Sequence, residues 1–226
     1  KKPEEDSARL DYLPSSASKA GKTLVTVGGA AAAAFTAVGV AAVKSAADAE
    51  TAFAKVKTLL RDGTDMTAYY DDIKAVSSRT GVGFGDLSES VYSAISASVA
   101  QEDAVAFAEN AVKLAKGGFT STATSVDVLT TAINAYGLAA SDATHVSDVL
   151  ITAQNAGKTT VDELASSMGQ TIPVANASGA AVEDLAAQYA VLTKNGVATA
   201  EAGTGIKAML SELNSASSNI SGTLKE

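Results

Sequence analysis

Residues 157–168 read GKTTVDELASSM, and whether this stretch binds a phosphate or begins a helix decides how the chain folds. A phosphate-binding loop has the pattern G-x-x-x-x-G-K-[ST], because its first glycine lets the backbone amides turn towards the phosphates. Five residues before Gly157 the chain has Thr152, so that glycine is missing. The preceding residues also place Val146 and Leu150 at helical spacing, whereas such a loop follows a buried strand. The stretch therefore predicts a turn between two helices.

The same stretch carries the signals of a helix end and of a helix start. Gly157 is predicted to cap the first helix at its C-terminus. Thr160 and Glu163 have the S/T-x-x-E spacing of a capping box, in which each side chain accepts a hydrogen bond from the other residue's backbone amide. Further on, Pro173 has no amide hydrogen to donate, so we expect it to break this helix soon after Gly169 and to open a short new one.

Helical periodicity continues through the chain from residue 46 onward. Apolar residues recur three and four positions apart in stripes such as Val182, Leu185, Tyr189 and Leu192. No run of alternating β-branched residues competes with these stripes. Glycines stand between them and are predicted to form helix caps and turns: Gly81, Gly157, Gly179 and Gly196. The predicted fold class is all-α, with short to medium helices in hairpins, preceded by a long Ala/Gly-rich apolar helix.

One phrase recurs at predicted helix starts, a glycine followed within seven residues by an acidic residue and leucine. It occurs as Asp86-Leu87 after Gly81, Glu163-Leu164 after Gly157 and Asp184-Leu185 after Gly179. An acidic residue suits the first helical turn because helix N-termini carry partial positive charge. The spacing of the phrase is too irregular to predict a solenoid of fixed period, so we interpret the chain as stacked helical hairpins.

The first 45 residues differ in composition from the rest. Residues 1–22 are predicted to be a polar tail or linker. Residues 23–45 are predicted to form an apolar helix, whose uncharged part, residues 24–43, would be about 30 Å long and would match the hydrocarbon core of a bilayer. Its many small residues make insertion weak and equally suit tight helix contacts, so two interpretations stay open: a segment that enters a membrane during function, and a buried or self-associating helix. The candidate contact residues are Leu24, Val25, Val27, Gly28, Gly29, Ala32, Phe35, Val38, Gly39 and Val43.

Composition argues against several classes of function. A net charge of −8 disfavours nucleic-acid binding, which depends on clustered Lys and Arg. The chain has no cysteine and one histidine, His145, so we predict no metal site and no cofactor. Adjacent carboxylates such as Asp162-Glu163 diverge on a helix, and no serine stands in a G-x-S-x-G elbow. We therefore expect no catalytic residues and no enzyme activity. The chain begins with Lys1, and we expect it to be a fragment or processed product of a longer protein.

Three stretches carry a family resemblance: AADAETAFAKVKTLL at 46–60, KAVSSRTGVGFGDLSESVYSAISA at 74–97, and the whole of 157–217. Together they resemble the core region of phage tail tape-measure proteins. The third stretch is the most specific, with Met168-Gly169, Pro173-Val174-Ala175, Gly179, LTKNG at 192–196 and TAEAGTGIK at 199–207 in the family's order. We therefore interpret residues 46–217 as a helical tape-measure core and residues 218–226 as a polar tail.

The resemblance implies a structural role without catalytic residues. Tape-measure chains lie inside the tail tube, set its length, nucleate its assembly, and leave it at infection to aid passage of the genome through the host envelope. The implied partners are the tail tube protein, tail assembly chaperones, tail tip or baseplate hub proteins, further copies of the chain, and the host membrane. The implied locations are the virion tail, the host cytoplasm during assembly, and the host membrane at infection. The residues alone leave two alternatives, a membrane-inserting or pore-forming helical protein and a soluble helical interaction module.

Overall fold

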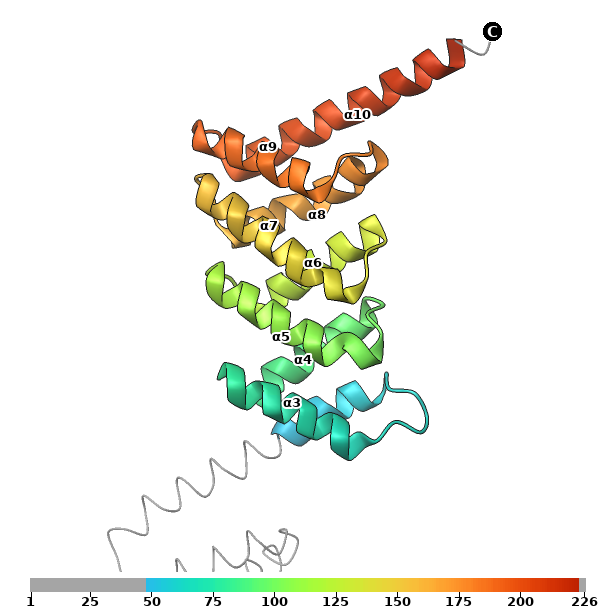
Figure 1. The fold of residues 1–226 in the computed structure, drawn as a ribbon, viewed down its shortest axis with the longest axis vertical. Coiled ribbons are helices and arrows are strands. Elements are labelled where there is room, and N and C mark those ends of the chain that lie inside the picture. The colour runs from blue at the N-terminus through green and yellow to red at the C-terminus, as the bar shows by residue number, and fades with distance from the viewer. Residues whose placement is uncertain (1–47, 224–226) are drawn as a thin grey trace, which may run out of the picture. The chain divides into compact units, whose positions relative to one another are not determined.

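The computed structural model describes residues 48–223, with side chains up to residue 215. The chain divides into two compact units, residues 1–51 and 52–226. Of the first unit only residues 48–51 are described, and they are helical. The apolar helix that we predict over residues 23–45 lies outside the described residues. The second unit contains the helices labelled in Figure 1.

Every regular element of the described residues is a helix. Residues 48–57 are helical, and the elements that follow are α3 (Met66–Thr80), α4 (Phe84–Ser96), α5 (Gln101–Gly117), α6 (Thr122–Tyr136), the short 3-10 helix η1 (Ala140–Asp142), α7 (Ala143–Ala156), α8 (Val161–Ala177), α9 (Val182–Lys194) and α10 (Thr199–Thr223). No strand occurs between residues 48 and 223, and the predicted all-α class is confirmed.

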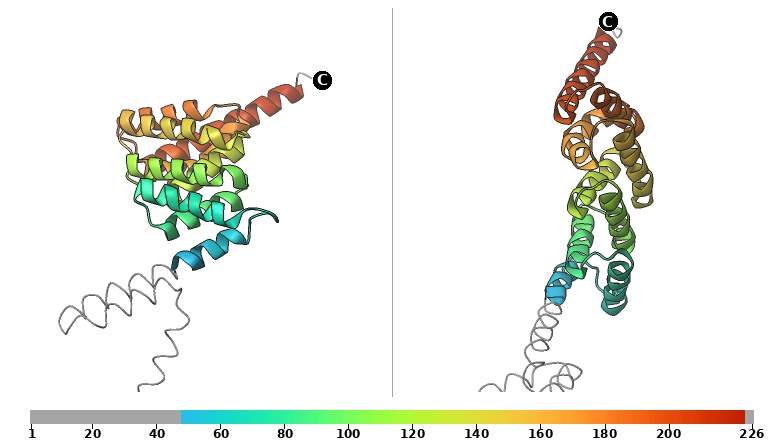
Figure 2. Two further views of the ribbon diagram at one scale, coloured as in Figure 1. Left: turned by 60° about the horizontal axis from the view of Figure 1, so that its bottom comes forward. Right: turned by 90° about the vertical axis from the view of Figure 1, so that its left-hand side faces the viewer.

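The helices of the second unit form two layers (Figures 1 and 2). One layer contains α4, α6, α8 and α10, and the other contains α3, α5, α7 and α9. Within a layer each helix packs beside the helix two places along the chain, and it also packs on its sequence neighbours in the other layer. Contacts are therefore local along the stack, as in solenoid proteins.

The stack has a nearly constant repeat. Helices α4, α6, α8 and α10 begin at residues 84, 122, 161 and 199, so each begins 38 or 39 residues after the previous one. The interpretation that the spacing is too irregular for a solenoid was therefore wrong. The glycine phrase hides the period because Gly81 and Gly157 precede α4 and α8 of one layer, whereas Gly179 precedes α9 of the other.

Small side chains fill much of the space between the helices. Ala94, Ala108 and Ala132 are fully buried, and so are larger residues such as Leu129 and Leu164. Alanine at contact positions lets neighbouring helices approach closely. The buried residues are spread along the whole stack, from Phe53 to Leu210, and they form one continuous core.

Helix α8 contradicts one prediction. Pro173 lies inside this helix, which runs unbroken from Val161 to Ala177. A proline inside a helix costs about 3 kcal/mol, because it lacks an amide hydrogen and crowds the carbonyl four residues earlier, here that of Gly169. However, Ile172 before the proline and Ala175 after it are both fully buried. Burial on both sides of Pro173 offsets the cost, so the predicted break and the predicted short helix are absent.

Candidate functional site

The turn that begins at Gly157 packs closely against α9. The backbone of Gly157 has φ −101° and ψ −173°, so its conformation does not require glycine. A Cβ atom there would lie 2.5 Å from Thr193 Oγ1 and 3.0 Å from Ala190 Cα. The next amide, of Lys158, donates to Thr193 Oγ1 at 3.2 Å. Glycine is needed at this position because two segments meet without space for a side chain.

Glu163 connects the starts of two helices in one layer. Its amide donates to Thr160 Oγ1 at 3.2 Å, and its Oε2 accepts from the Thr160 amide at 3.3 Å, which completes a capping box at the start of α8. The same Oε2 accepts from Thr199 Oγ1 at 2.9 Å, at the first residue of α10. Thr159 Oγ1 lies 2.8 Å from Thr199 Oγ1. One carboxylate therefore caps α8 and also holds α10 beside it.

The other glycines singled out from the sequence lie at turns. Gly81 ends α3 in the left-handed conformation, and its amide donates to the Ser77 carbonyl at 2.8 Å. Gly179 and Gly196 follow the residues that end α8 and α9, and both have positive φ, 76° and 93°. Only glycine adopts this backbone conformation without strain, so these residues let the chain reverse direction between layers.

A buried tyrosine joins three helices. Tyr189 of α9 is 0% exposed, and its hydroxyl oxygen lies 2.8 Å from Ser167 Oγ and 3.0 Å from Thr171 Oγ1 of α8. Ser167 Oγ also donates to the carbonyl of Thr199, at the start of α10, at 3.3 Å. Burial raises the pKa of Tyr189, and its two side-chain hydrogen bonds act in the opposite direction. Because the hydroxyl is satisfied only by these partners, it fixes the placement of α8, α9 and α10.

Gly203 makes room for this hydrogen-bonded cluster. A Cβ atom on Gly203 would lie 2.0 Å from Ser167 Oγ and 2.5 Å from the Tyr189 hydroxyl oxygen. At Gly205, two residues later in the same helix, a Cβ atom would meet nothing within 4 Å. Sequence reasoning did not single out Gly203. The available signal was a glycine inside a helical pattern, which lowers helix propensity and often has a packing reason.

Asparagines connect successive helices at the opposite end of the same layer. Three of them donate to the end of the helix before: Asn134 to the Ala97 carbonyl at 2.8 Å, Asn176 to the Ala135 carbonyl at 2.7 Å, and Asn214 to Ser178 Oγ at 3.1 Å. Carbonyl groups at helix C-termini lack partners within their own helix, so two of these bonds satisfy groups that would otherwise need water. Hydrogen bonds at both ends therefore join α10 to α8, and an asparagine at one end joins α8 to α6 and α6 to α4.

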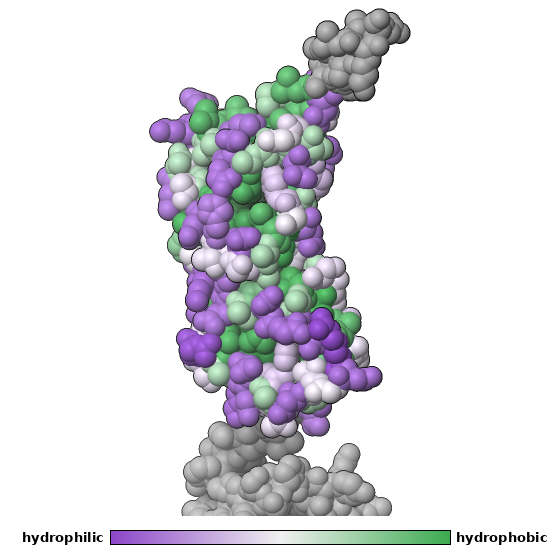
Figure 3. Space-filling model, turned by 45° about the vertical axis from the view of Figure 1, so that its right-hand side comes forward, coloured by the Kyte–Doolittle hydropathy of each residue, from purple (hydrophilic) through white to green (hydrophobic). Residues whose placement is uncertain are grey.

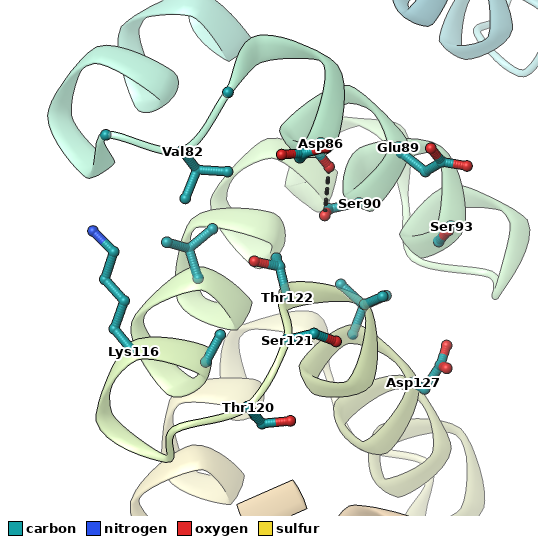
Figure 4. A pocket seen from close by; sticks show the side chains of 16 residues that line it. Val82, Asp86, Glu89, Ser90, Ser93, Lys116, Thr120, Ser121, Thr122 and Asp127 are labelled. Carbon is teal, nitrogen blue, oxygen red and sulfur yellow. Dashed lines mark hydrogen bonds between the residues drawn. The ribbon is translucent and has the colours of Figure 1, made fainter.

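A hollow of about 630 Å³ lies between the α3–α4 turn, α4, α5 and the start of α6 (Figure 4). Its lining includes the carboxylates of Asp86, Glu89 and Asp127. The ammonium group of Lys116 donates to the carbonyl of Thr80, the last residue of α3, so its charge serves a helix end. No group of three metal-binding side chains occurs in the part of the chain that the structure describes. We assign this hollow no catalytic chemistry.

His145 bridges α7 and α9. Its Nε2 atom lies 2.5 Å from Glu183 Oε1, and both side chains are more than half exposed. The hydrogen bond from His145 lowers the pKa of Glu183. Exposed pairs of this kind contribute at most about 1 kcal/mol to the free energy of unfolding. This pair is therefore a weak surface contact between two helices of one layer.

The membrane prediction concerns residues that the structure does not describe. Among residues 48–223 no helix is both long and apolar enough to span a bilayer. The candidate residues from Leu24 to Val43 lie outside this range, so their membrane or self-association role stays a prediction. The proposed boundaries at residues 22, 45 and 217 also stay predictions.

Known phage proteins are similar to this chain. Residues 70–226 match the family model described as phage-related minor tail protein. A probable tape measure protein of Clostridium phage phiCD119 is 32% identical over 153 residues, which cover 66% of this chain and 16% of that protein. The tape measure protein of Pneumococcus phage Dp-1 is 30% identical over 91 residues, which cover 40% of this chain and 8% of that protein. The chain thus spans less than a fifth of either relative. No solved structure matches it.

Proposed function

Because the chain belongs to the family of phage-related minor tail proteins, we propose that it forms part of a tail tape-measure protein. The observation that carries the proposal is the family match over residues 70–226, which falls on the helical stack from α3 to α10. The hydrogen bonds that join the repeats hold helices in place and present no reacting group, so the role proposed is structural and not enzymatic.

In this role the chain lies in the lumen of the tail tube, where tube subunits polymerise around it and its length sets the length of the tail. The local contacts of the stack support this proposal. Architectures in which each repeat contacts only its neighbours can open and close unit by unit. Such a chain is able to extend along a narrow tube and to fold compactly at the tail tip, where it nucleates assembly.

At infection the proposed protein leaves the tube ahead of the genome and aids its passage through the host envelope. The net charge of −8 supports this step, because an acidic chain does not bind the phosphate backbone of the DNA that follows it. Entry of residues 24–43 into the host membrane belongs to the same proposal. Flotation with liposomes tests it: wild-type chain should float and a Phe35→Lys, Val38→Lys variant should not, and equal behaviour would contradict membrane entry.

The proposed partners are the tail tube protein, tail assembly chaperones, tail tip or baseplate hub proteins and further copies of the chain. No cofactor and no specific nucleic-acid contact is included. The proposed locations are the host cytoplasm during assembly, the virion tail, and the host membrane at infection.

The test of the length-setting role removes one repeat in frame from the parent gene. Helices α6 and α8 begin 39 residues apart, so deletion of residues 122–160 brings the start of α8 into the place of α6 and keeps the layer in register. If the region is extended helix in the tube, electron microscopy should show tails shorter by about 60 Å, at about 1.5 Å per residue. If it stays stacked, the shortening should be about 10 Å, the usual separation of packed helices.

Duplication of residues 122–160 is the matched control and should lengthen the tails by the same amount. Assembled tails of unchanged length in both variants would refute the proposed length-setting role for this region. Opposite shifts of equal size would support it, and their magnitude would distinguish the extended state from the stacked state.

A further inference from the structure

One aromatic side chain stands apart on the surface of the stack. On the face drawn in Figure 3, apolar side chains lie among hydrophilic ones, which is ordinary for a protein surface. Phe119 lies in the turn between α5 and α6 and is 84% exposed. The other large apolar residues that are exposed between residues 48 and 215 are at most 59% exposed. Exposure alone is weak evidence for a contact, because single apolar residues are common on surfaces.

The backbone of Phe119 has a conformation that favours glycine. Its φ is 54°, a left-handed value that is rare for bulky residues because Cβ then crowds the following carbonyl oxygen. Each described residue with positive φ stands three positions before the next helix, and five of the seven are glycines: Gly63, Gly81, Ser98, Phe119, Gly137, Gly179 and Gly196. Phe119 therefore occupies a glycine position of the repeated turn, and its exposed ring contributes no burial that offsets the strain.

Both neighbours of Phe119 are fixed against the start of α8. A Cβ atom on Gly118 would lie 2.5 Å from Val161 Cβ, so the backbone is in close contact there. Thr120 Oγ1 donates a hydrogen bond to Asp162 Oδ1 at 2.6 Å. The turn therefore presents the ring in one place, and strained residues that the surrounding structure fixes in this way are typical of ligand contacts.

Phe119 directly precedes residues that line the hollow of about 630 Å³ (Figure 4). The lining includes residues 120–123, which follow Phe119, and residues 81–83 of the turn before α4. Val112 and Val126, each 1% exposed, belong to its apolar part. An exposed aromatic ring beside such a hollow is suited to the docking of a polypeptide, because the ring and the hollow can each contact one of its side chains.

The charges of the hollow indicate the chemistry of its occupant. The lining contains the carboxylates of Asp86, Glu89 and Asp127 and the single ammonium group of Lys116. That ammonium group donates to the carbonyl of Thr80 at the end of α3. Within residues 48–215 neither Asp86 nor Asp127 forms an ion pair. Charge complementarity therefore favours an occupant that carries arginine or lysine.

A basic segment of a partner protein fits this chemistry better than other occupants. A second copy of this chain has the same net charge of −8, and nucleic acid and anionic lipid also bring negative charge. A basic polypeptide segment brings a cation for the carboxylates and an apolar side chain for the hollow. A guanidinium group can also stack on the ring of Phe119, since aromatic faces attract cations.

We propose that this hollow and Phe119 form a docking site for a basic segment of another protein. Phe119 is the fixed aromatic contact, the apolar lining takes an apolar side chain of the segment, and Asp86 and Asp127 pair with its cations. The inference goes beyond the proposed function. Because it rests on the turn and the hollow alone, failure of the length-setting role leaves it standing.

Fluorescence anisotropy with the full chain tests the docking site. The probe is a short labelled peptide of arginine, leucine and alanine, and the control probe has glutamate in place of each arginine. Wild-type chain should bind the arginine probe and not the glutamate probe. Phe119→Gly should weaken binding about 10-fold or more, as expected for the loss of a central aromatic contact. Since glycine suits the backbone there, this variant should unfold at no lower urea concentration than wild type.

Further variants separate docking from general attraction between opposite charges. Asp86→Asn, Asp127→Asn should weaken binding of the arginine probe about 10-fold. Asp148→Asn, Glu201→Gln is the matched control, because it removes the same charge outside the lining and should bind as wild type does. Phe119→Tyr keeps an aromatic ring and should also bind as wild type does. If Phe119→Gly unfolds more readily than wild type, Phe119→Asn replaces it, because asparagine tolerates positive φ.

Three results would overturn the proposal. One is a wild-type chain that does not bind the arginine probe at about 1 mM, where even weak docking is populated. Another is binding that Phe119→Gly leaves unchanged, or that both pairs of charge substitutions weaken equally. The third is flotation with anionic liposomes that Phe119→Gly abolishes without any loss of peptide binding, which would assign the ring to a membrane contact.

Discussion

Alanine substitutions at two glycines of α10 should change stability in opposite directions. Gly203→Ala and Gly205→Ala lie two residues apart in one helix, and each should gain about 1 kcal/mol from helix propensity. At Gly205 a new Cβ atom meets nothing within 4 Å, so the whole gain is expected. At Gly203 the new atom would lie 2.0 Å from Ser167 Oγ and 2.5 Å from the Tyr189 hydroxyl oxygen.

The cost at Gly203 follows from what must move. Ser167 can rotate away, but it then loses its hydrogen bonds with Tyr189 and with the Thr199 carbonyl, each contributing about 1 kcal/mol. Tyr189 is fully buried, and displacing its ring adds an overpacking cost of about 1 to 3 kcal/mol. With the propensity gain subtracted, Gly203→Ala should lower the free energy of unfolding by about 2 to 4 kcal/mol.

Urea unfolding followed by circular dichroism measures both variants against wild type. Gly205→Ala is the matched control, and its unfolding midpoint should rise while that of Gly203→Ala falls. A combined Ser167→Ala, Gly203→Ala variant should recover part of the loss, because the nearest clashing oxygen is gone. If Gly203→Ala is as stable as Gly205→Ala, the close packing of α10 on Ser167 and Tyr189 is incorrect.

Three further substitutions test other parts of the stack. His145 lowers the pKa of Glu183, so this carboxylate stabilises the fold above its unfolded pKa of about 4.3, and the stabilisation disappears as pH falls through the lower folded pKa. By urea unfolding, Glu183→Gln should therefore lose at most about 1 kcal/mol at pH 6, and the loss should shrink as the pH is lowered below about 4.3. Pro173→Ala should raise the free energy of unfolding by about 1 to 3 kcal/mol by restoring a helical hydrogen bond, whereas the exposed Gln170→Ala on the same helix should change it by less than about 0.5 kcal/mol. Asn176→Ala should cost about 1 kcal/mol and should speed amide exchange at the end of α6, with exchange in α3 unchanged; equal protection throughout would argue against the contact with α6.

Signals that act within one helical turn could be predicted from the sequence. Thr160 and Glu163 are three residues apart, and the structure has the capping box that this spacing predicts. Gly157 was interpreted correctly as a helix end, but the reason for glycine there is Thr193, which lies on another helix. The sequence pattern identified the position without its cause.

Features that depend on distant residues escaped prediction. Pro173 stays helical because of burial against neighbouring helices, and no local rule reports that burial. Gly203 is explained by a tyrosine and a serine on two other helices. The repeat was hidden because alternate helices belong to different layers, so only comparison within one layer reveals the period. The contact of Glu163 with α10 could not be predicted either, because Thr199 lies on a different helix, 36 residues further along the chain.

The hydrogen bonds that join successive repeats have a mechanical consequence. Because the repeats follow one another along the chain, a pulling force applied at the two ends acts in series on every contact between successive repeats. The weakest of these contacts opens first. Within the described residues, α3 packs on α5 less extensively than α10 packs on α8, so opening should begin near α3. Each opened repeat of 38 or 39 residues would add about 130 Å of extended chain, at about 3.4 Å per residue. A curve of force against extension should therefore show peaks at regular intervals.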